Sequence, residues 1–543
     1  MQLTCVGPLR LPLLHGFELR ELLRWALGVE SLPAGLIPFA PESGQLDFSA
    51  GDRYGFGVTA IGAGRVAVDR LLLELSARLP ARGQGEGPRL ATHCRLHRAW
   101  PLPPPQAQRE IEALAELDSI DLRFLSPLRL HLPRKERRGA GRWVSEQTFP
   151  AQLLLTETRR RVAQALGWTD DVTRIRLPAH GLKMLPRPAV RLPLTLGSDG
   201  DAKRRISGIQ GRLHLHGLPS ELLPLIVAAR YLHVGQAIPL GFGRFDLPDL
   251  APIAPEPWRA STSLGARVAE PGRLARAADL VLAGGPAGAA ASGSSLVGGL
   301  ARTLSRGDYA PVPMRSRTIP KPSGGVRQLA IPSVPDRIVQ RAALDLLAPI
   351  LDGLFADVSF GFRRGRSRFD AARTIAAGWR QGERTVLDAD IEAFFDNVPW
   401  PRLLARLDAL FPRDPIVDLL ASWITCPVRQ AGRRIQRLAG ITQGSPISPL
   451  LANFVLDELD SALLASGARL VRYADDFAVL CRNDREAGRR LLRTEHELMR
   501  LGLRLNVDKT EVRAFTAGWT FLGFVICGSL ILPRTPSRAP ALG

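Results

Sequence analysis

The sequence predicts an α+β fold divided over more than one domain, and three observations support this. The chain has 543 residues, more than one ordinary domain holds. Its first half alternates short β-type runs with amphipathic helical runs, as ferredoxin-like modules do. Its second half carries acidic residues at the ends of apolar strands. We expect an N-terminal domain over 1–250, a Pro/Gly/Ala-rich linker over 251–305, a second domain over 306–530 and a tail over 531–543.

The charge of the chain indicates a polyanionic partner. Lys and Arg number 72 against 52 Asp and Glu, which gives a formal net charge of +20 at pH 7. Such an excess is the electrostatic footprint of a nucleic-acid-binding protein. A ribosomal or nonspecific binder would carry the same excess, so charge alone does not give the function.

The cysteines and the apolar stretches predict a cytoplasmic protein without membrane contact. The five cysteines are scattered and form no C-x-x-C pair, which argues against a zinc ribbon or a disulfide framework. Pro8, Arg10 and Pro12 interrupt the N-terminal apolar run before a signal-peptide core forms. The charge-free stretch 280–301 is long enough to span a bilayer, but its small residues and Pro286 favour a flexible linker.

The first elements of the N-terminal half follow from their periodicity. Apolar residues at helical spacing predict helices, and runs of β-formers predict extended segments. The helices are expected over Phe17–Leu27, Arg70–Leu79 and Leu153–Leu166, the last of them basic, and the extended segments over Tyr54–Ile61 and Ile120–Leu132.

A glycine-rich loop closes this half. The segment Gly211–Gly217 predicts a strand with alternating faces, and Pro219–Tyr231 predicts a helix after it. Glycines in the loop that follows would let backbone N–H groups approach a phosphate, and an arginine supplies charge. Such a loop is also found as a plain turn. The RNA-binding residues expected here are His233, Gly235, Gly241, Gly243 and Arg244.

The second half contains two acidic strand ends. The apolar run Thr385–Asp390 ends in Asp390, and Leu470–Leu480 predicts a hairpin with Asp475 and Asp476 at its turn. An Asp-Asp turn alone is most often only solvated. Two acidic ends far apart in the sequence meet only if their strands are neighbours in one sheet, where carboxylates can hold two Mg²⁺ for phosphoryl transfer. Asp388 shares the face of Asp390 and is secondary.

These residues resemble the motifs of reverse transcriptases, and most of all those of the group II intron-like enzymes. Tyr473–Asp476 resembles their Y-x-D-D box, Asp390–Asp396 their first acidic motif, and Gln443–Pro449 their Q-G-x-P motif. Gly502–Lys509 and Phe521–Phe524 follow in the family's order. The resemblance implies a right-hand fingers and palm fold. It also implies catalysis by Asp390, Asp475 and Asp476, with two Mg²⁺ contacted by these three residues and Ile391.

The same resemblance implies the substrate contacts. Lys321 and Arg327 would neutralise the incoming triphosphate, unless they are only solvated cations. Gln443 and Gly444 would contact the template and the nascent pair. Lys509 could protonate the departing pyrophosphate, although a structural lysine is nearly as plausible.

Three further segments of this half carry expectations. Phe395 would exclude a 2′-hydroxyl and favour deoxynucleotides, with core packing assigned to Phe394; the two roles could be exchanged. The cations of Phe360–Arg366 would suit template phosphates. Fingers strands are expected around Arg317–Lys321 and Gly325–Pro332, and a supporting helix over Pro335–Leu347.

The N-terminal half resembles the Cas-six family of RAMP endoribonucleases, which process CRISPR repeat RNA. Two segments show this resemblance: the glycine-rich loop, and Asp121–Arg129, which matches the family strand F-x-S/T-P-L-R. That chemistry needs no metal or other cofactor: a 2′-hydroxyl attacks the neighbouring phosphate with the help of a general base. His15 is the first candidate for the base and His233 the second. His214 and His216 share a strand face and could contact RNA or solvent.

The two resemblances together predict a reverse transcriptase fused to an endoribonuclease. The expected role is CRISPR spacer acquisition from RNA, with an RNA template, a DNA primer, dNTPs, repeat RNA and the Cas-one/Cas-two integrase as partners. Few residues follow Phe524, so we expect a thumb and integrase lost by truncation or supplied by another chain. The alternatives are a group II intron or retroelement reverse transcriptase whose N-terminal module binds RNA without cleaving it, and an RNA-binding protein with a degenerate polymerase.

Overall fold

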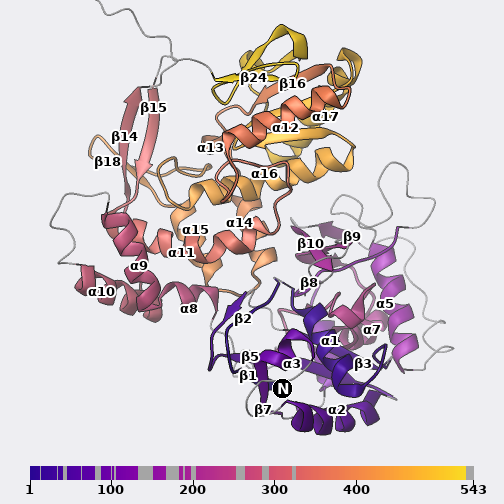
Figure 1. The fold of residues 1–543 in the computed structure, drawn as a ribbon. Helices are drawn as coiled ribbons and strands as arrows, with labels where there is room; N and C mark the ends of the chain where they lie inside the picture. The colour runs from indigo at the N-terminus through magenta and orange to yellow at the C-terminus, as the bar shows by residue number, and fades with distance from the viewer. Residues whose placement is uncertain are drawn as a thin grey trace, which may run out of the picture. The chain divides into compact units, whose positions relative to one another are not determined.

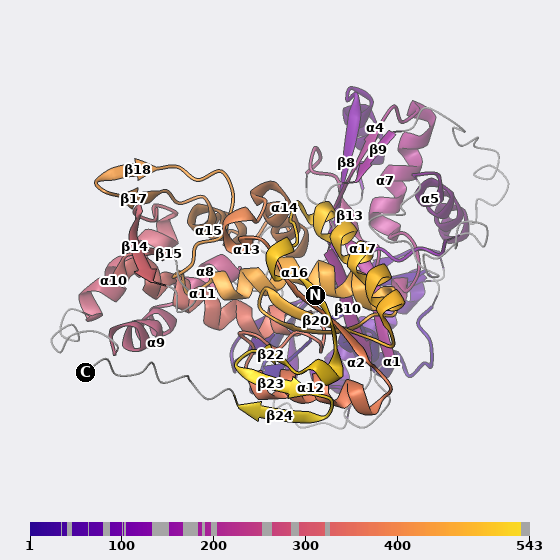
Figure 2. The same ribbon diagram turned by 90° about the horizontal axis from the view of Figure 1, so that it is seen from above.

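The computed structural model has the predicted α+β architecture, divided into two compact units. Unit 1 comprises residues 1–267 with 404–418, and unit 2 comprises 268–403 with the chain from 419 onward. Figures 1 and 2 show the ribbon from two directions. The structure describes residues 1–533 except 13, 34, 41–45, 63, 80–86, 100, 103–104, 133–150, 167–182, 187–189, 197–203, 252, 254–262, 284–292 and 321–325.

The first module of unit 1 is a small sheet with helices. Its strands β1 (Gln2–Cys5), β5 (Arg53–Gly55) and β7 (Cys94–Arg98) pair in the order β5-β1-β7. Two predicted helices are confirmed as α1 (Gly16–Leu27) and α2 (Gly64–Arg78), the second beginning earlier than expected. Leu19, Leu22 and Leu23 on α1 are fully buried, as their spacing predicts. The module is completed by α3 (Arg89–His93), the two-stranded pair β2 (Leu9–Arg10) and β4 (Asp47–Phe48), and a pair of β3 (Leu36–Phe39) with β6 (Gly57–Ala60).

The predicted strand Tyr54–Ile61 is only partly correct. It is divided at Phe56 between β5 and β6, which belong to different sheets. Phe56 itself is completely buried, and its N–H donates to the carbonyl of Met1 at 2.9 Å. The chain therefore changes sheet at a core residue, which a continuous run of β-formers does not reveal.

The second module of unit 1 is a four-stranded antiparallel sheet in the order β13-β8-β12-β9. Its central strands β8 (Ser119–Phe124) and β12 (Arg212–His216) alternate buried leucines and half-buried polar residues. The edge strands are β9 (Lys183–Pro186) and β13 (Phe245–Asp246), and a separate pair is formed by β10 (Val190–Leu196) and β11 (Arg204–Gln210). The helices are α4 (Ala107–Ala115), α5 (Ala151–Leu166), α7 (Leu223–Leu232) and the 3₁₀ turns η2 (Ser220–Leu222) and η3 (Ile238–Leu240).

Three expectations for this module have mixed outcomes. The helix predicted over Leu153–Leu166 is confirmed as α5, and the helix over Pro219–Tyr231 as η2 and α7. The extended segment Ile120–Leu132 is a strand only as far as Phe124. Beyond it the described residues form isolated bridges, one of them from Leu128 to Ile209, because the intervening Ser126–Pro127 step leaves the ladder and Pro lacks an N–H.

The flexible linker predicted for 251–305 is wrong over much of its length. The chain there forms α8 (Leu264–Val268), α9 (Pro271–Leu282) and α10 (Gly293–Arg306). Leu274, Ala277 and Ala278 of α9 are buried against α10 and α11 (Val334–Asp352). Small residues such as Gly and Ala are common in linkers, but they also permit close packing of helices. None of the helices in the described part of the chain combines the length and apolar character of a bilayer span.

Unit 2 holds two four-stranded sheets and one three-stranded sheet. The fingers sheet has the order β15-β14-β17-β18, built from β14 (Met314–Pro320), β15 (Val326–Ile331), β17 (Val428–Gln430) and β18 (Arg433–Ile435). The predicted fingers strands and the helix over Pro335–Leu347 are confirmed as β14, β15 and α11. Ser333 caps α11 by accepting the Asp336 N–H.

The palm sheet has the order β19-β20-β16-β21, formed by β19 (Arg469–Tyr473), β20 (Asp476–Cys481), β16 (Thr385–Asp390) and β21 (Glu511–Ala514). The helices α12 (Arg368–Arg380), α16 (Ser448–Ala465) and α17 (Asp484–Leu501) pack on it. Shorter helices of this part of the chain are α13 (Phe394–Asn397), α14 (Trp400–Leu410), α15 (Ile416–Ile424) and the turns η6 (Val507–Lys509) and η7 (Phe515–Ala517).

A three-stranded sheet ends the described chain. It consists of β22 (Trp519–Phe521), β23 (Phe524–Cys527) and β24 (Leu530–Pro533). Trp519, Phe521 and Ile526 join Ile375 of α12 and Val386 of β16 in one apolar cluster. The predicted tail therefore loses residues 531–533 to β24.

Candidate active sites

The palm hairpin brings the two predicted acidic strand ends together. Tyr473 and Asp476 face each other across the turn from β19 to β20, with Ala474 at a left-handed φ of +60°. On the other side of β20, Asp476 is the register partner of Asp390 on β16. Directly opposite residues of an antiparallel pair have Cβ atoms about 5 Å apart. The backbone register itself thus places Asp390, Asp475 and Asp476 at one strand end.

The carboxylates of this strand end lie close enough to perturb one another. Burial, followed by the charges of Asp388, Asp390 and Asp475, raises the pKa of Asp476 to about 7. Burial and the charge of Asp390 raise the pKa of Asp475 as well. The group therefore holds more negative charge than this half-buried environment tolerates without a cation.

A lysine supplies part of the compensating positive charge. Lys509 Nζ donates to Asp390 Oδ2 at 2.8 Å, and this hydrogen bond raises the pKa of the lysine. Asn506 Nδ2 donates to the same oxygen at 3.3 Å, while its backbone N–H donates to the Asp390 carbonyl at 2.9 Å. Lys509 thus lies at the acidic centre, as the resemblance implies, and its ammonium contacts one of the three carboxylates.

The donor set fits a hard divalent cation such as Mg²⁺. In the described residues, no group of three or more His, Cys, Asp or Glu side chains already has metal-binding geometry. The chemistry of the oxygens is nevertheless suitable, because Mg²⁺ prefers carboxylates and a bound cation would lower the raised pKa values of Asp475 and Asp476. The side chain of Ile391 is buried and contains no oxygen, so the residue can offer only its backbone carbonyl to a cation.

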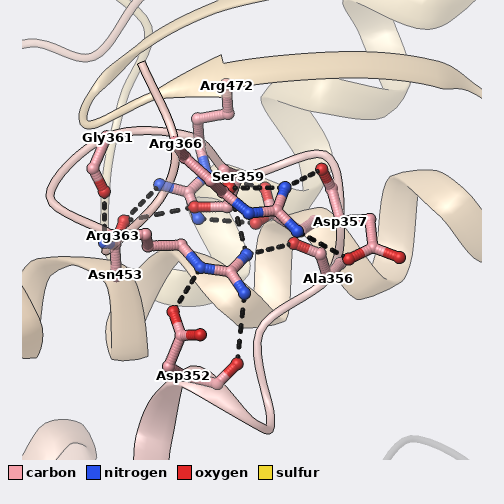
Figure 3. Close-up of polar contacts among 10 residues, drawn as sticks. Asp352, Ala356, Asp357, Ser359, Gly361, Arg363, Arg366, Asn453 and Arg472 are labelled. Carbon is pink, nitrogen blue, oxygen red and sulfur yellow. Dashed lines mark hydrogen bonds and ion pairs between the residues drawn. The ribbon is translucent and has the colours of Figure 1, made fainter. Parts of the chain in front are cut away.

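A buried arginine holds the turn that carries these aspartates. Arg472 is completely buried and donates twice to Asp460, at 2.7 and 2.6 Å. Its Nη1 also donates to Asn453 Oδ1 and to the carbonyl of Ala474, both at 2.9 Å. Figure 3 shows this arginine among the neighbouring polar groups. The sequence analysis did not single out Arg472, although an arginine between apolar strand residues, three positions before Asp475, was a visible signal.

The cationic segment Phe360–Arg366 does not offer all its arginines to a template, which corrects our expectation. Arg363 is buried and donates to the Asp352 carboxylate and to the carbonyls of Ala356 and Ser359. Arg366 pairs with Asp357 at 2.7 Å (Figure 3). The guanidinium groups close this loop on itself because their fixed forks match backbone carbonyls. Arg364 is exposed.

The predicted nucleotide contacts are arranged along β15 and the Q-G segment. Arg327 is exposed on β15. Its positive charge partly offsets the burial that raises the pKa of Asp475. The Ala330 N–H donates to the Gln443 carbonyl at 2.8 Å. Gly444 has φ +112°, and a Cβ there would lie 3.1 Å from the Ala330 carbonyl oxygen. Lys321 lies outside the described residues.

The two neighbouring phenylalanines differ in exposure. Phe394 is buried and Phe395 is half-buried, with their rings 5.4 Å apart edge to face. The backbone of Phe395 accepts the Ile441 N–H at 2.7 Å. Core packing therefore belongs to Phe394, and Phe395 is the ring available to a nucleotide.

In unit 1, His15 lies beside the glycine-rich loop. It precedes α1, is 2% exposed, and faces the rings of Tyr54 and Phe48 at 5.6 and 6.1 Å. A small hollow of about 40 Å³ is lined by His15 together with Ser126, Gly241 and Arg244. A Cβ on Gly16 would lie 1.7 Å from the Leu240 carbonyl oxygen, so glycine permits this approach of α1 to the loop.

The glycine-rich loop is used differently from our expectation. The N–H groups of Gly241 and Gly243 donate to the carbonyls of Ile238 and Pro127, so they are not free for a phosphate. Gly235, Gly241 and Gly243 all have positive φ. A Cβ on Gly235 or Gly243 would collide with backbone oxygen, 2.6 Å from Arg129 and 1.7 Å from Val234. These glycines therefore allow the loop to pack against the 125–130 segment.

His233 and Arg244 are also buried, which corrects their assignment as direct RNA contacts. His233 is 2% exposed with φ +58°, and Arg244 is 6% exposed and stacked 4.6 Å over the Phe39 ring. Burial, followed by the charges of Arg244 and Arg161, holds the pKa of His233 well below its usual value. A neutral, enclosed imidazole is a packing group rather than a phosphate ligand.

Two other histidines are more accessible. His214 Nδ1 lies 2.5 Å from Asp121 Oδ1, and both side chains are 20% exposed. The rings of His214 and His216 are 4.5 Å apart, edge to face on one side of β12. The shared strand face that the sequence predicts is therefore present.

Comparisons with known proteins agree with both halves. A family model described as reverse transcriptase (RNA-dependent DNA polymerase) matches residues 319–526, and one described as CRISPR-associated endoribonuclease Cas6 matches 122–245. Protein YkfC of Escherichia coli (strain K12) is 34% identical over 263 residues, 40% of this chain and 68% of that protein. The group II intron-encoded protein LtrA of Lactococcus lactis subsp. cremoris is 30% identical over 37% of this chain, which spans a third of LtrA.

A solved structure shares the fold over nearly the whole chain. It is a chain of a partial Cas6-RT-Cas1–Cas2 complex, with a TM-score of 0.64 and 24% identity over 92% of this chain and 90% of that chain. A chain of the full complex gives the same TM-score, but the present chain spans 56% of it.

Proposed function

The chain belongs to the reverse transcriptases and carries a Cas6 endoribonuclease domain ahead of the polymerase, and from this premise we propose that it copies RNA into DNA during CRISPR spacer acquisition. The observation that carries the polymerase proposal is the register pairing of Asp390 with Asp476, next to Asp475. The fingers strands β14 and β15 belong to the same compact unit as this strand end, and the charge of Arg327 on β15 acts on Asp475.

The proposed mechanism assigns a role to each polar group of the palm. Asp390, Asp475 and Asp476, with the Ile391 carbonyl, would hold two Mg²⁺, which activate the attacking hydroxyl and stabilise the leaving pyrophosphate when bound. Arg327 and Lys321 neutralise the triphosphate. Lys509, now on Asp390, is positioned to give a proton to pyrophosphate.

Selection of template and sugar is proposed for three more residues. Gln443 and Gly444 pack their backbone on Ala330 and contact the template strand and the nascent pair. The half-buried ring of Phe395 closes the space that a 2′-hydroxyl would need, so deoxynucleotides are preferred.

Primer extension on an RNA template tests the polymerase. We expect the Asp475→Ala, Asp476→Ala double variant to make no DNA, while Asp508→Asn, an exposed acid on η6, extends normally. Undiminished extension by the double variant would refute the proposal.

For the N-terminal domain we propose metal-independent cleavage of CRISPR repeat RNA with His15 as general base. His15 is as buried as His233, but it lines the small hollow with Ser126, Gly241 and Arg244, whereas His233 is not among the residues lining that hollow. This position supports the assignment. Repeat-RNA cleavage in EDTA should be lost in His15→Ala and kept in His97→Ala, a histidine outside this hollow. Full activity of His15→Ala would rule the assignment out.

The proposed partners are the Cas1 and Cas2 integrase proteins, named in the titles of the two similar complexes. Co-purification with them would support this. The compartment proposed is the cytoplasm, since the cysteines among the described residues form no disulfide.

The similarity to LtrA favours the alternative of an intron-type polymerase with an RNA-binding N-terminal module. Uncleaved but tightly bound repeat RNA would support that alternative.

A further inference from the structure

Phe362 stands beside the Tyr473–Asp476 turn in a conformation that a bulky residue rarely adopts. Its φ is +58°, in the left-handed region, and 56% of the residue is exposed. Both features are unfavourable, because a Cβ crowds the backbone there and an apolar ring meets water. A backbone outlier persists only where its surroundings enforce it, and such outliers cluster at functional sites.

The surroundings of Phe362 do enforce it. A Cβ on the preceding Gly361 would lie 2.5 Å from the Ala474 nitrogen, so the loop touches the catalytic turn backbone to backbone. Asn453 Nδ2 donates to the Gly361 carbonyl at 2.8 Å (Figure 3). The Phe360 N–H donates to the Arg472 carbonyl at 2.8 Å. The buried Arg363 clamps the other side of the loop. The loop and the turn are therefore one rigid support.

The ring of Phe362 lies next to that of Tyr473, the first residue of the Tyr473–Asp476 turn. Its centroid lies 6.5 Å from that of the half-buried Tyr473 ring, with 42° between the planes. Tyr473 precedes Asp475 by two residues, so the neighbouring rings of Phe362 and Tyr473 lie close in the chain to the predicted metal ligands. A primer whose 3′-hydroxyl reacts at those carboxylates would bring its terminal nucleotide near these two rings.

We propose that Phe362 is a positioning residue on which the terminal base of the primer stacks. The proposal rests on the proposed polymerase function of the same site. A π-face suits every base, so the contact would position primers without regard to sequence. Arg363 and Arg366, which contact carbonyls and carboxylates of this loop, would then serve to hold the ring in place.

Substitutions at Phe362 separate stacking from a structural role. Phe362→Gly removes the ring and relieves the positive φ, so its melting temperature should equal or exceed that of the wild type. The KM for primer–template should rise about 10-fold in Phe362→Gly and Phe362→Leu, with kcat for dNTP addition less affected. Phe362→Trp should stay within about 2-fold. Leu492→Ala, at an exposed apolar residue of α17, is the matched control.

A fluorescence measurement keeps the proposal testable if a variant folds poorly. With 2-aminopurine at the primer 3′ end, we expect quenching on binding to the wild type and to Phe362→Trp, and much less on binding to Phe362→Leu. Equal quenching and equal KM in wild type and Phe362→Leu would overturn the proposal. If the wild type extends no primer at all, the polymerase function fails instead, which the wild-type lane alone decides.

Discussion

The palm and the N-terminal unit differ in how their candidate residues are held. In the palm, three acidic side chains meet because strand register pairs Asp390 with Asp476. In unit 1, the candidate residues His15, His233 and Arg244 are buried, and the loop glycines bond within the protein. Motifs whose side chains do chemistry at a strand end predict positions well. Motifs rich in glycine report close packing as readily as ligand contact.

The largest difference between the two regions should appear when one palm carboxylate is neutralised. Asp390→Asn should lower primer extension by at least about 10³-fold, because a metal ligand worth several kcal/mol is lost. Repeat-RNA cleavage in EDTA by the same variant should be unchanged. A parallel loss of both activities would mean that the regions do not work independently.

The next largest effect should be a loss of stability when the buried ion pair that supports the palm turn is broken. Asp460→Ala leaves the fully buried Arg472 without its carboxylate, and we expect about 3 kcal/mol less stability of unit 2 by denaturant unfolding. The matched change Asp345→Ala breaks a pair with Arg341 that is more than a third exposed, and should cost about 0.5 kcal/mol or less. Equal costs would show that the buried pair is not the support that we describe.

A glycine pair tests whether the loop of unit 1 is a packing element. Gly243→Ala adds a Cβ 1.7 Å from the Val234 oxygen at φ +70°, and should destabilise unit 1 by at least about 2 kcal/mol. Gly51→Ala has φ +92° but open space around the new Cβ, so only the backbone preference acts, at about 1 kcal/mol. A larger effect at Gly51 in thermal melts would contradict this account.

The smallest effect is a pH dependence of opposite sign in the two regions. Folded Asp476, with a pKa near 7, holds a proton that the unfolded chain releases above pH 4, so in EDTA the palm should lose stability as pH rises from about 4 to 7. His233 has a lowered pKa, so the unfolded chain gains a proton that the folded chain does not. Unit 1 should therefore lose stability as pH falls below about 6.5.

Hydrogen exchange of peptides from each region would measure both trends. Asp476→Asn should flatten the dependence in the palm, and His233→Asn, which tolerates a positive φ, should flatten it in unit 1. Trends of the same sign in both regions, unchanged by these variants, would refute the electrostatic assignment.

Sequence reasoning reached the palm because side-chain chemistry there is local and periodic. The strand ends, the hairpin turn and α11 follow from apolar runs, turn residues and a serine cap. It did not reach the helices α9 and α10, whose Gly and Ala serve tertiary packing, nor the change of sheet at Phe56. It also took Arg363 and Arg366 for ligand contacts, since only a folded loop shows that their partners are nearby carbonyls and carboxylates.

Counting bound metal ions tests the central claim most directly. With primer–template and a non-reactive dNTP analogue, Mn²⁺ titration followed by electron paramagnetic resonance should give two ions per wild-type chain. The same titration of an Asp390→Asn, Asp476→Asn double variant should give less than one. Two tightly bound ions in the double variant would contradict the account, because the paired carboxylates of β16 and β20 would then not be the metal site.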